Sequence, residues 1–143
     1  MFEQFVKYIA RTYRGSRKIV EVGVGHRIDI AIMVKLSLPD TEVIVTDKDE
    51  NWVRSRKTKR IRAVADDVMF PSVPIYEGAR LIYSLHPPLE LVPFLDDLAT
   101  KVGSDLIVVP VYDEREAFRV GWKSINAEGR VLGFLRQQKT SIN

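Results

Sequence analysis

The chain has 143 residues, is 45% hydrophobic and carries a formal net charge of +3. This length and hydrophobic content suit a single compact domain over residues 1–143. The absence of cysteine excludes disulfides, thiolate metal sites and a cysteine nucleophile, and we expect no metal site. No apolar run is long enough to span a membrane and nothing resembles a signal peptide, so we expect a soluble, cytoplasmic protein.

The first third of the chain predicts two helices around a strand and a glycine turn. Residues 1–14 place apolar side chains at helical spacing on one face, and Gly15 ends this helix. Residues 19–22 form an apolar strand that carries Glu21 and leads into a turn at Gly23 and Gly25. A nearly all-apolar helix follows from Asp29 to residue 38. Nucleotide-binding α/β folds begin in this order, so the turn is a candidate floor for a ligand.

The next segments predict two strands, each followed by acidic residues. Residues 42–46 are rich in β-branched side chains and run directly into Asp47. Residues 61–65 form a short third strand that precedes Asp66 and Asp67. Residues 54–62, from Arg54 at one end to Arg62 at the other, hold six basic side chains in nine positions and predict a basic surface patch.

The second half of the chain predicts two further strands, a helix and a terminal hairpin. A strand over 79–85 ends at His86, and a helix over 91–102 is either kinked or begun by Pro93. Residues 106–111 form an unbroken apolar strand. Alternation over 118–122 and a second apolar run over 131–135 indicate a hairpin.

The arrangement of these elements indicates a three-layer α/β fold. Only residues 112–117 separate the fifth strand from the hairpin, which is too short for a crossover helix. We therefore expect the sixth strand to run antiparallel to the fifth. The fold class is a mostly parallel, Rossmann-like sheet with a C-terminal antiparallel hairpin, and one helix layer is expected to be thin.

The glycine turn carries a resemblance to a known fold family. The residues Glu21, Gly23 and Gly25 match the pattern acidic-x-Gly-x-Gly of the Rossmann-like S-adenosylmethionine-dependent methyltransferases, while Arg27 replaces the third glycine of that pattern. The whole chain also resembles a small uncharacterised archaeal family of this fold. The resemblance implies that S-adenosylmethionine is the cofactor and that methyl transfer is the activity.

The same resemblance assigns roles to the acids that follow the second and third strands. It implies that Asp47 accepts hydrogen bonds from the ribose hydroxyls and that Asp66 or Asp67 contacts the adenine amine. Nothing in the sequence suggests that folding requires Asp47. The fourth-strand motif of amine methylators, Asp/Asn-Pro-Pro-aromatic, is only echoed by His86 and the three residues after it, so the resemblance does not extend to methylation of a base amine.

Charge gives a separate reason to favour this cofactor over a dinucleotide. S-adenosylmethionine has no phosphate and carries sulfonium and ammonium charges, which the acids at Glu21, Asp47 and Asp66 or Asp67 complement. The dinucleotide fingerprint Gly-x-Gly-x-x-Gly also fails, because Ile28 stands in place of its third glycine. Arg27 suits either a phosphate or the methionine carboxylate of the cofactor.

Each assignment has a structural alternative. Glu21 can simply hydrogen-bond the turn, and Asp66 and Asp67 can cap the next turn. His86 lies where such folds place their chemistry and is the candidate to orient or deprotonate an acceptor, whereas His26 is a weaker one. The basic run of residues 54–62 is either a solvated edge or a contact for an RNA or protein partner.

Two functions therefore compete at this stage. The first is a small S-adenosylmethionine-dependent methyltransferase of unknown acceptor. The second is a non-catalytic nucleotide- or dinucleotide-binding module that acts through a partner protein or RNA.

Overall fold

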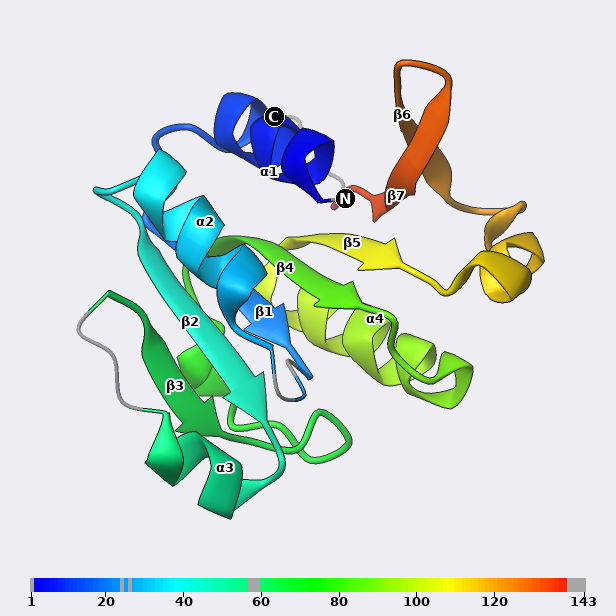
Figure 1. The fold of residues 1–143 in the computed structure, drawn as a ribbon. Helices are drawn as coiled ribbons and strands as arrows, with labels where there is room; N and C mark the ends of the chain where they lie inside the picture. The colour runs from blue at the N-terminus through cyan, green and yellow to red at the C-terminus, as the bar shows by residue number, and fades with distance from the viewer. Residues whose placement is uncertain (1, 24, 26, 57–59, 139–143) are drawn as a thin grey trace, which may run out of the picture.

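The structure is a computed structural model that describes residues 2–138 apart from 24, 26 and 57–59. In these residues seven strands form one sheet in the order β3-β2-β1-β4-β5-β7-β6 (Figure 1). The strands β1 to β5 pair in parallel, and β7 is antiparallel to both of its neighbours. The strand bounds are β1 Lys18–Val22, β2 Glu42–Asp47, β3 Arg62–Ala65, β4 Ala79–Leu85, β5 Asp105–Val109, β6 Lys123–Ala127 and β7 Arg130–Arg136.

Helices cover the two faces of the sheet unequally. The first face carries α1 (Glu3–Thr12), α2 (Asp29–Ser37) and α3 (Glu50–Ser55), and the second carries α4 (Val92–Val102) (Figure 1). Successive side chains of a strand point to opposite faces of the sheet, so each face has its own hydrophobic core. Ile19 packs in the core under α1, α2 and α3, and its neighbour Val20 packs in the core under α4. Segment 66–77 and the 3-10 helix η3 (Tyr112–Phe118) complete the second face, which has the thinner helical layer.

The expected fold class is confirmed, and the structure resolves the question of Pro93. This proline is in the first turn of α4, where a missing N–H costs no helical hydrogen bond, so it begins the helix and does not kink it. Helix α3, between β2 and β3, was not predicted. It has only six residues, and the Asp49 side chain caps it by accepting a hydrogen bond from the Trp52 N–H (3.1 Å).

The hairpin exists, but its first strand was placed wrongly. Residues 118–122 are not a strand, because η3 continues to Phe118 and Gly121 has a φ of +84°, which extended backbone does not allow. The Phe118 and Trp122 rings, four residues apart, pack on each other with centroids 5.1 Å apart. Moreover, β7 and not β6 pairs with β5, so the expectation that the sixth strand is antiparallel to the fifth is wrong.

Candidate cofactor-binding site

The glycine turn leaves β1 and is fixed to the end of β2. Gly23 and Gly25 have φ values of +68° and +63°, which L side chains rarely adopt, so this path favours glycine. The Gly23 N–H donates to the Thr46 carbonyl and the Gly25 N–H donates to Asp47 Oδ2, both at 2.9 Å. The turn therefore lies against the carboxyl ends of two neighbouring parallel strands, where α/β folds bind ligands.

Asp47 holds this turn in place. Besides the bond from Gly25 to Oδ2, its Oδ1 accepts a hydrogen bond from the Asp49 N–H at 2.9 Å. A carboxylate oxygen has two lone pairs, so each oxygen keeps one acceptor site for another donor. The half-buried Asp47 carboxylate thus supports the turn and is still able to meet a ligand hydroxyl.

Glu21 lies in the floor of the site and is only 2% exposed. Its Oε1 accepts a hydrogen bond from the Tyr83 hydroxyl at 2.8 Å. Burial is the largest influence on this carboxyl and raises the pKa of Glu21 to about 8; the Tyr83 hydrogen bond opposes this shift, the Asp29 charge adds to it and the Arg27 charge reduces it. The group is therefore poised to ionise when a cation approaches.

A cavity of about 280 Å³ brings several of these residues together. Its lining unites five of the predicted site residues with three that were not predicted: Glu21, Gly23, Gly25, Arg27 and His86, with Phe2, Ile30 and Leu85. Ile30 comes from α2 and Phe2 from the start of α1, so the first helix closes one side of the cavity.

His86 stands at the exit of β4 in an unusual backbone conformation. Its φ is +55°, and its N–H donates to the Val109 carbonyl at 2.7 Å, which ties the exit of β4 to the end of β5. The ring of Phe2 lies 6.3 Å from the His86 ring, centroid to centroid. No hydrogen bond to the His86 ring is recorded among the described residues. The fold thus places an exposed imidazole at the cavity, and no carboxylate among the described residues is hydrogen-bonded to it.

Arg27 has a partner of its own at the mouth of the cavity. Its guanidinium pairs with the Asp29 carboxylate at 3.0 Å, and this bond raises the pKa of Arg27 and lowers the pKa of Asp29. The guanidinium also lies 5.6 Å from the centre of the Phe2 ring. Both charged side chains are largely exposed, so this pair can open for a ligand at small cost. His26, the weaker histidine candidate, lies outside the described residues.

Asp66 and Asp67 follow β3 but do not line the cavity. Asp66 accepts hydrogen bonds from the Tyr76 hydroxyl (2.6 Å) and the Ser72 N–H (3.0 Å), so it holds the irregular segment that leads to β4. Asp67 Oδ1 accepts from the Met69 N–H at 2.9 Å, which makes it a turn acid. For Oδ2 of Asp67 no donor is recorded in the described part of the chain, so Asp67 keeps an oxygen for a ligand.

The basic run is only partly described. Arg54 lies 3.8 Å from Glu50, Arg62 lies 4.0 Å from Glu42, and the Arg56 guanidinium lies 5.8 Å from the Trp52 ring centre. Residues 57–59 of the run lie outside the described residues. Because β3 is parallel to β2, its first residue, Arg62, lies at the amino end of the sheet, at the opposite edge from the glycine turn.

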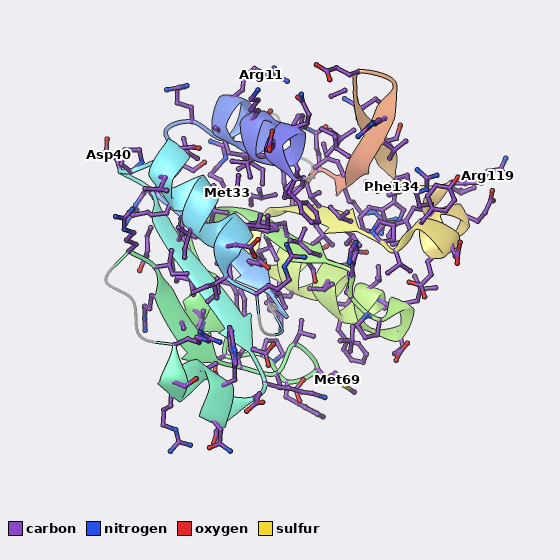
Figure 2. All side chains as sticks on the ribbon, viewed as in Figure 1. Arg11, Met33, Asp40, Met69, Arg119 and Phe134 are labelled. Carbon is purple, nitrogen blue, oxygen red and sulfur yellow. The ribbon has the colours of Figure 1, made fainter. Side chains whose placement is uncertain are left out.

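This amino edge is basic well beyond the run. Exposed Arg14 and Arg17, from the loop before β1, line a hollow of about 360 Å³ together with Asp40, which Figure 2 labels. Arg80, exposed at the start of β4, acts electrostatically on the nearby Tyr13. The sequence indicates the contiguous basic run, but it does not show that these three arginines lie at one edge, because only the strand order brings them together.

A larger hollow of about 580 Å³ lies away from the glycine turn, beside η3 and β7. Figure 2 labels two of its lining residues, Arg119 and Phe134. Two arginines and two acids in the lining balance each other, and it contains none of the predicted residues. Among the described residues, no group of three or more His, Asp or Glu is arranged to hold a metal ion, and no helix is long and apolar enough to cross a membrane.

Tyr83 is the polar residue beside this site that sequence reasoning missed. It is paired in register with Glu21 across β4 and β1, and it is fully buried. A tyrosine inside an apolar strand is typical of a core residue, and only the register of two strands separated by sixty residues shows that its hydroxyl meets the carboxylate.

Two relatives with similar sequences are both described as UPF0146 proteins. A UPF0146 protein of Archaeoglobus fulgidus is 42% identical over 135 residues, which cover 94% of this chain and 95% of the relative. One from Methanocaldococcus jannaschii is 30% identical over 125 residues, covering 87% of this chain and 88% of the relative.

Solved structures with a similar fold are methyltransferase-like proteins of low sequence identity. The fibrillarin/Nop5p complex matches with a TM-score of 0.64 at 11% identity, covering 88% of this chain and 74% of that one. TrmN from Thermus thermophilus matches with a TM-score of 0.60 at 18% identity, covering 95% and 48%. The apo form of the S-adenosylmethionine-dependent methyltransferase SibL matches with a TM-score of 0.59 at 14% identity, covering 94% and 54%.

These likenesses confirm the methyltransferase-like Rossmann fold and the resemblance to an archaeal family. The family model described as "Uncharacterised protein family (UPF0146)" matches residues 2–138. The chain therefore belongs to the family UPF0146.

Proposed function

We propose that this protein binds S-adenosylmethionine at the carboxyl ends of β1 and β2 and transfers its methyl group to an acceptor at the exit of β4. The observation that carries the proposal is the buried Glu21 carboxylate in a cavity beside a glycine turn that Asp47 holds. A buried carboxylate that opens onto a cavity favours a cationic ligand and disfavours a phosphate.

The site residues fit the parts of this cofactor. Glu21 accepts from the ammonium of the methionine part, and the Arg27 guanidinium pairs with its carboxylate once released from Asp29. The Asp47 oxygens accept from the ribose hydroxyls. Asp67, with Oδ2 available, is better suited than Asp66 to contact the adenine amine.

The size of the cavity supports a ligand that is only partly enclosed. About 280 Å³ lies just below the roughly 300–1,000 Å³ typical of ligand pockets. We infer that Glu21 and Arg27 in the cavity would hold the amino-acid end, and that Asp47, which does not line the cavity, would hold the nucleoside.

Catalysis in this proposal depends on alignment. When bound, the cofactor supplies a methyl group on a positively charged sulfur. Methyl transfer needs the acceptor in line with that group, and orientation alone contributes a large part of the rate. His86 is the side chain placed to hold the acceptor or take its proton.

A second candidate function is a binding module without catalysis. It is favoured by the His86 ring, which donates to no carboxylate among the described residues, so no such partner orients it as a base. In this case occupancy of the site would be signalled to a partner. The neighbour solved as a fibrillarin/Nop5p complex supports a partner protein for this fold, and the basic amino edge supports RNA.

Thermal melting with different ligands separates these functions from dinucleotide binding. A ligand at about a hundredfold its Kd adds roughly 2.7 kcal/mol of stability. We expect S-adenosylmethionine and S-adenosylhomocysteine to raise the Tm, and NAD, NADP and ATP to leave it unchanged. Stabilisation by NADP or ATP alone overturns the proposal. Methyl transfer from labelled cofactor to candidate acceptors then distinguishes an enzyme from a binding module.

A further inference from the structure

Tyr83 and Glu21 form a buried hydrogen-bonded pair at the floor of the cavity. They stand on neighbouring strands in register, with the Tyr83 hydroxyl 2.8 Å from Glu21 Oε1. Tyr83 is fully buried, and the Phe5 ring of α1 packs edge-on against it with centroids 5.5 Å apart. Packing therefore fixes the hydroxyl, and the pair is rigid before any ligand arrives.

This hydrogen bond makes the two carboxylate oxygens of Glu21 different. Oε1 is occupied by Tyr83, whereas no donor to Oε2 is recorded among the described residues. Glu21 lines the cavity, which places its carboxyl where a ligand in the cavity can contact it. Oε2 is thus the atom of Glu21 that meets a ligand.

The charged groups around Glu21 come from each element packed on it. The Asp29 charge of α2 disfavours ionisation of Glu21, and the Arg27 charge of the turn favours it. His86 lines the same cavity as Glu21. Tyr83 of β4 favours the ionised carboxylate by donating to it. Burial, and next the Glu21 charge, raise the pKa of Tyr83 well above its ordinary value, so Tyr83 remains a donor at neutral pH.

We propose that Tyr83 is a positioning residue for the ligand: its hydroxyl fixes the Glu21 carboxylate and favours its ionised form, so that Oε2 accepts from the ligand's ammonium. This inference rests on the proposed function. Below about pH 8 most Glu21 carboxyls are protonated before binding, so binding of the ammonium releases a proton from Glu21 to solvent.

The test compares Tyr83→Phe with the parent and with a matched control, Tyr13→Phe. Tyr13 is also a buried tyrosine, and its hydroxyl donates to Asp105 Oδ2 at 2.9 Å, at the amino edge away from the cavity. S-adenosylhomocysteine affinity is measured by calorimetry between about pH 6 and pH 8.5. For the parent we expect affinity to rise with pH.

Tyr83→Phe should weaken binding at least about tenfold at pH 7, because the ionised Glu21 carboxylate loses the hydrogen bond from the Tyr83 hydroxyl. The rise of affinity with pH should also move to higher pH. Tyr13→Phe should change neither. Glu21→Gln, which cannot ionise, should abolish the pH dependence. If Tyr83→Phe binds with the parent's affinity and pH profile, or if Tyr13→Phe moves the profile equally, the inference is overturned.

A ligand-free measurement separates failure of this inference from failure of the proposed function. Carbon NMR of the Glu21 carboxyl measures the pH at which half of this group is ionised without ligand. The signal is assigned by its disappearance in Glu21→Gln. Tyr83→Phe should raise that midpoint, and 3-fluorotyrosine at position 83, a stronger donor of nearly the same shape, should lower it even if the phenylalanine variant does not fold. If the parent does not bind S-adenosylhomocysteine, the proposed function and the ligand role of Tyr83 both fall. An unmoved midpoint overturns the role of Tyr83 in ionisation by itself.

Discussion

At the scale of single residues, Asp47 links folding to the site. From the sequence it seemed dispensable for folding, but its carboxylate accepts from two backbone N–H groups that fix the turn. We expect Asp47→Ala to lower the free energy of unfolding by about 1–2 kcal/mol, because two charge-assisted bonds at a half-buried site are lost. Urea denaturation measures this. Asp40→Ala, which removes an exposed acid at the other edge, is the control and should change stability by less than about 0.5 kcal/mol. A fully stable Asp47→Ala variant contradicts the role of these bonds.

Glu21 makes stability depend on pH in a direction opposite to that of a salt-bridged acid. Its folded pKa, about 8, is above its ordinary value of 4.5, so between these values the folded state binds more protons than the unfolded state. The stability that Glu21 contributes is therefore present below about pH 4.5 and lost as pH rises to about 8, with a slope of up to about 1.4 kcal/mol per pH unit. Glu21→Gln mimics the protonated form. Its stability advantage over the parent should grow from pH 5 to pH 8, and a constant difference between the two refutes the shifted ionisation.

At the scale of elements, local patterns predicted most strands and helices but not how they meet. The periodicity of α1 and α4 and the β-branched runs of β1, β2 and β5 are strong signals because each buries a continuous face. Helix α3 is too short to show a period. Residues 118–122 were mistaken for a strand because their large apolar side chains occupy every second position, whereas η3 ends at the first of these residues. Alternation over five residues does not distinguish a strand from a turn in which two rings pack edge to face.

The hairpin turn offers a test at this scale. Only Glu128 and Gly129 separate β6 from β7, and both have positive φ (+53° and +75°), as in a type I′ turn. Glutamate is poorly suited to that conformation, so Glu128→Asn should stabilise the protein by roughly 0.5–1 kcal/mol, while Gly129→Ala in the same turn should destabilise it by about 1 kcal/mol or more. Thermal melting of the two variants checks the opposite signs. Two shifts of the same sign are incompatible with this turn.

At the scale of the whole molecule, strand order sorts charge between the two edges of the sheet. The parallel strands send their carboxyl ends to one edge, where the acids of the site gather: Glu21, Asp29, Asp47, Asp49, Asp66 and Asp67. The opposite edge collects arginines from loops far apart in sequence. This amino edge also holds acids, among them Asp40, Glu42 and Asp105, so the separation of charge is partial. The net charge of +3 does not reveal it, because only topology brings the arginines of separate loops to one edge. The acidic edge suits a cationic cofactor and repels a nucleic acid, so any nucleic acid must meet the other edge.

The basic edge therefore predicts salt-dependent binding of a nucleic acid through its phosphates. Among the described residues, the most exposed aromatic side chains, Phe70 and Tyr112, do not line the hollow at this edge, so we expect arginines and not base stacking to supply the contact. We expect an RNA hairpin to bind, with affinity falling steeply between about 50 and 200 mM salt.

Replacing Arg14, Arg17 and Arg80 together by serine should flatten the dependence of log Kd on log salt by up to about three, because up to three phosphate contacts are lost. The control removes the same charge from the hairpin side by replacing Arg119, Lys123 and Arg130, all exposed, with serine. Fluorescence anisotropy with labelled RNA measures both slopes, and a DNA duplex of the same sequence tests whether the 2′-hydroxyl matters. If the two triple variants lose affinity equally, net charge and not this edge is responsible. If the parent shows no binding at low salt, these arginines are a solvated surface and the nucleic-acid contact is refuted.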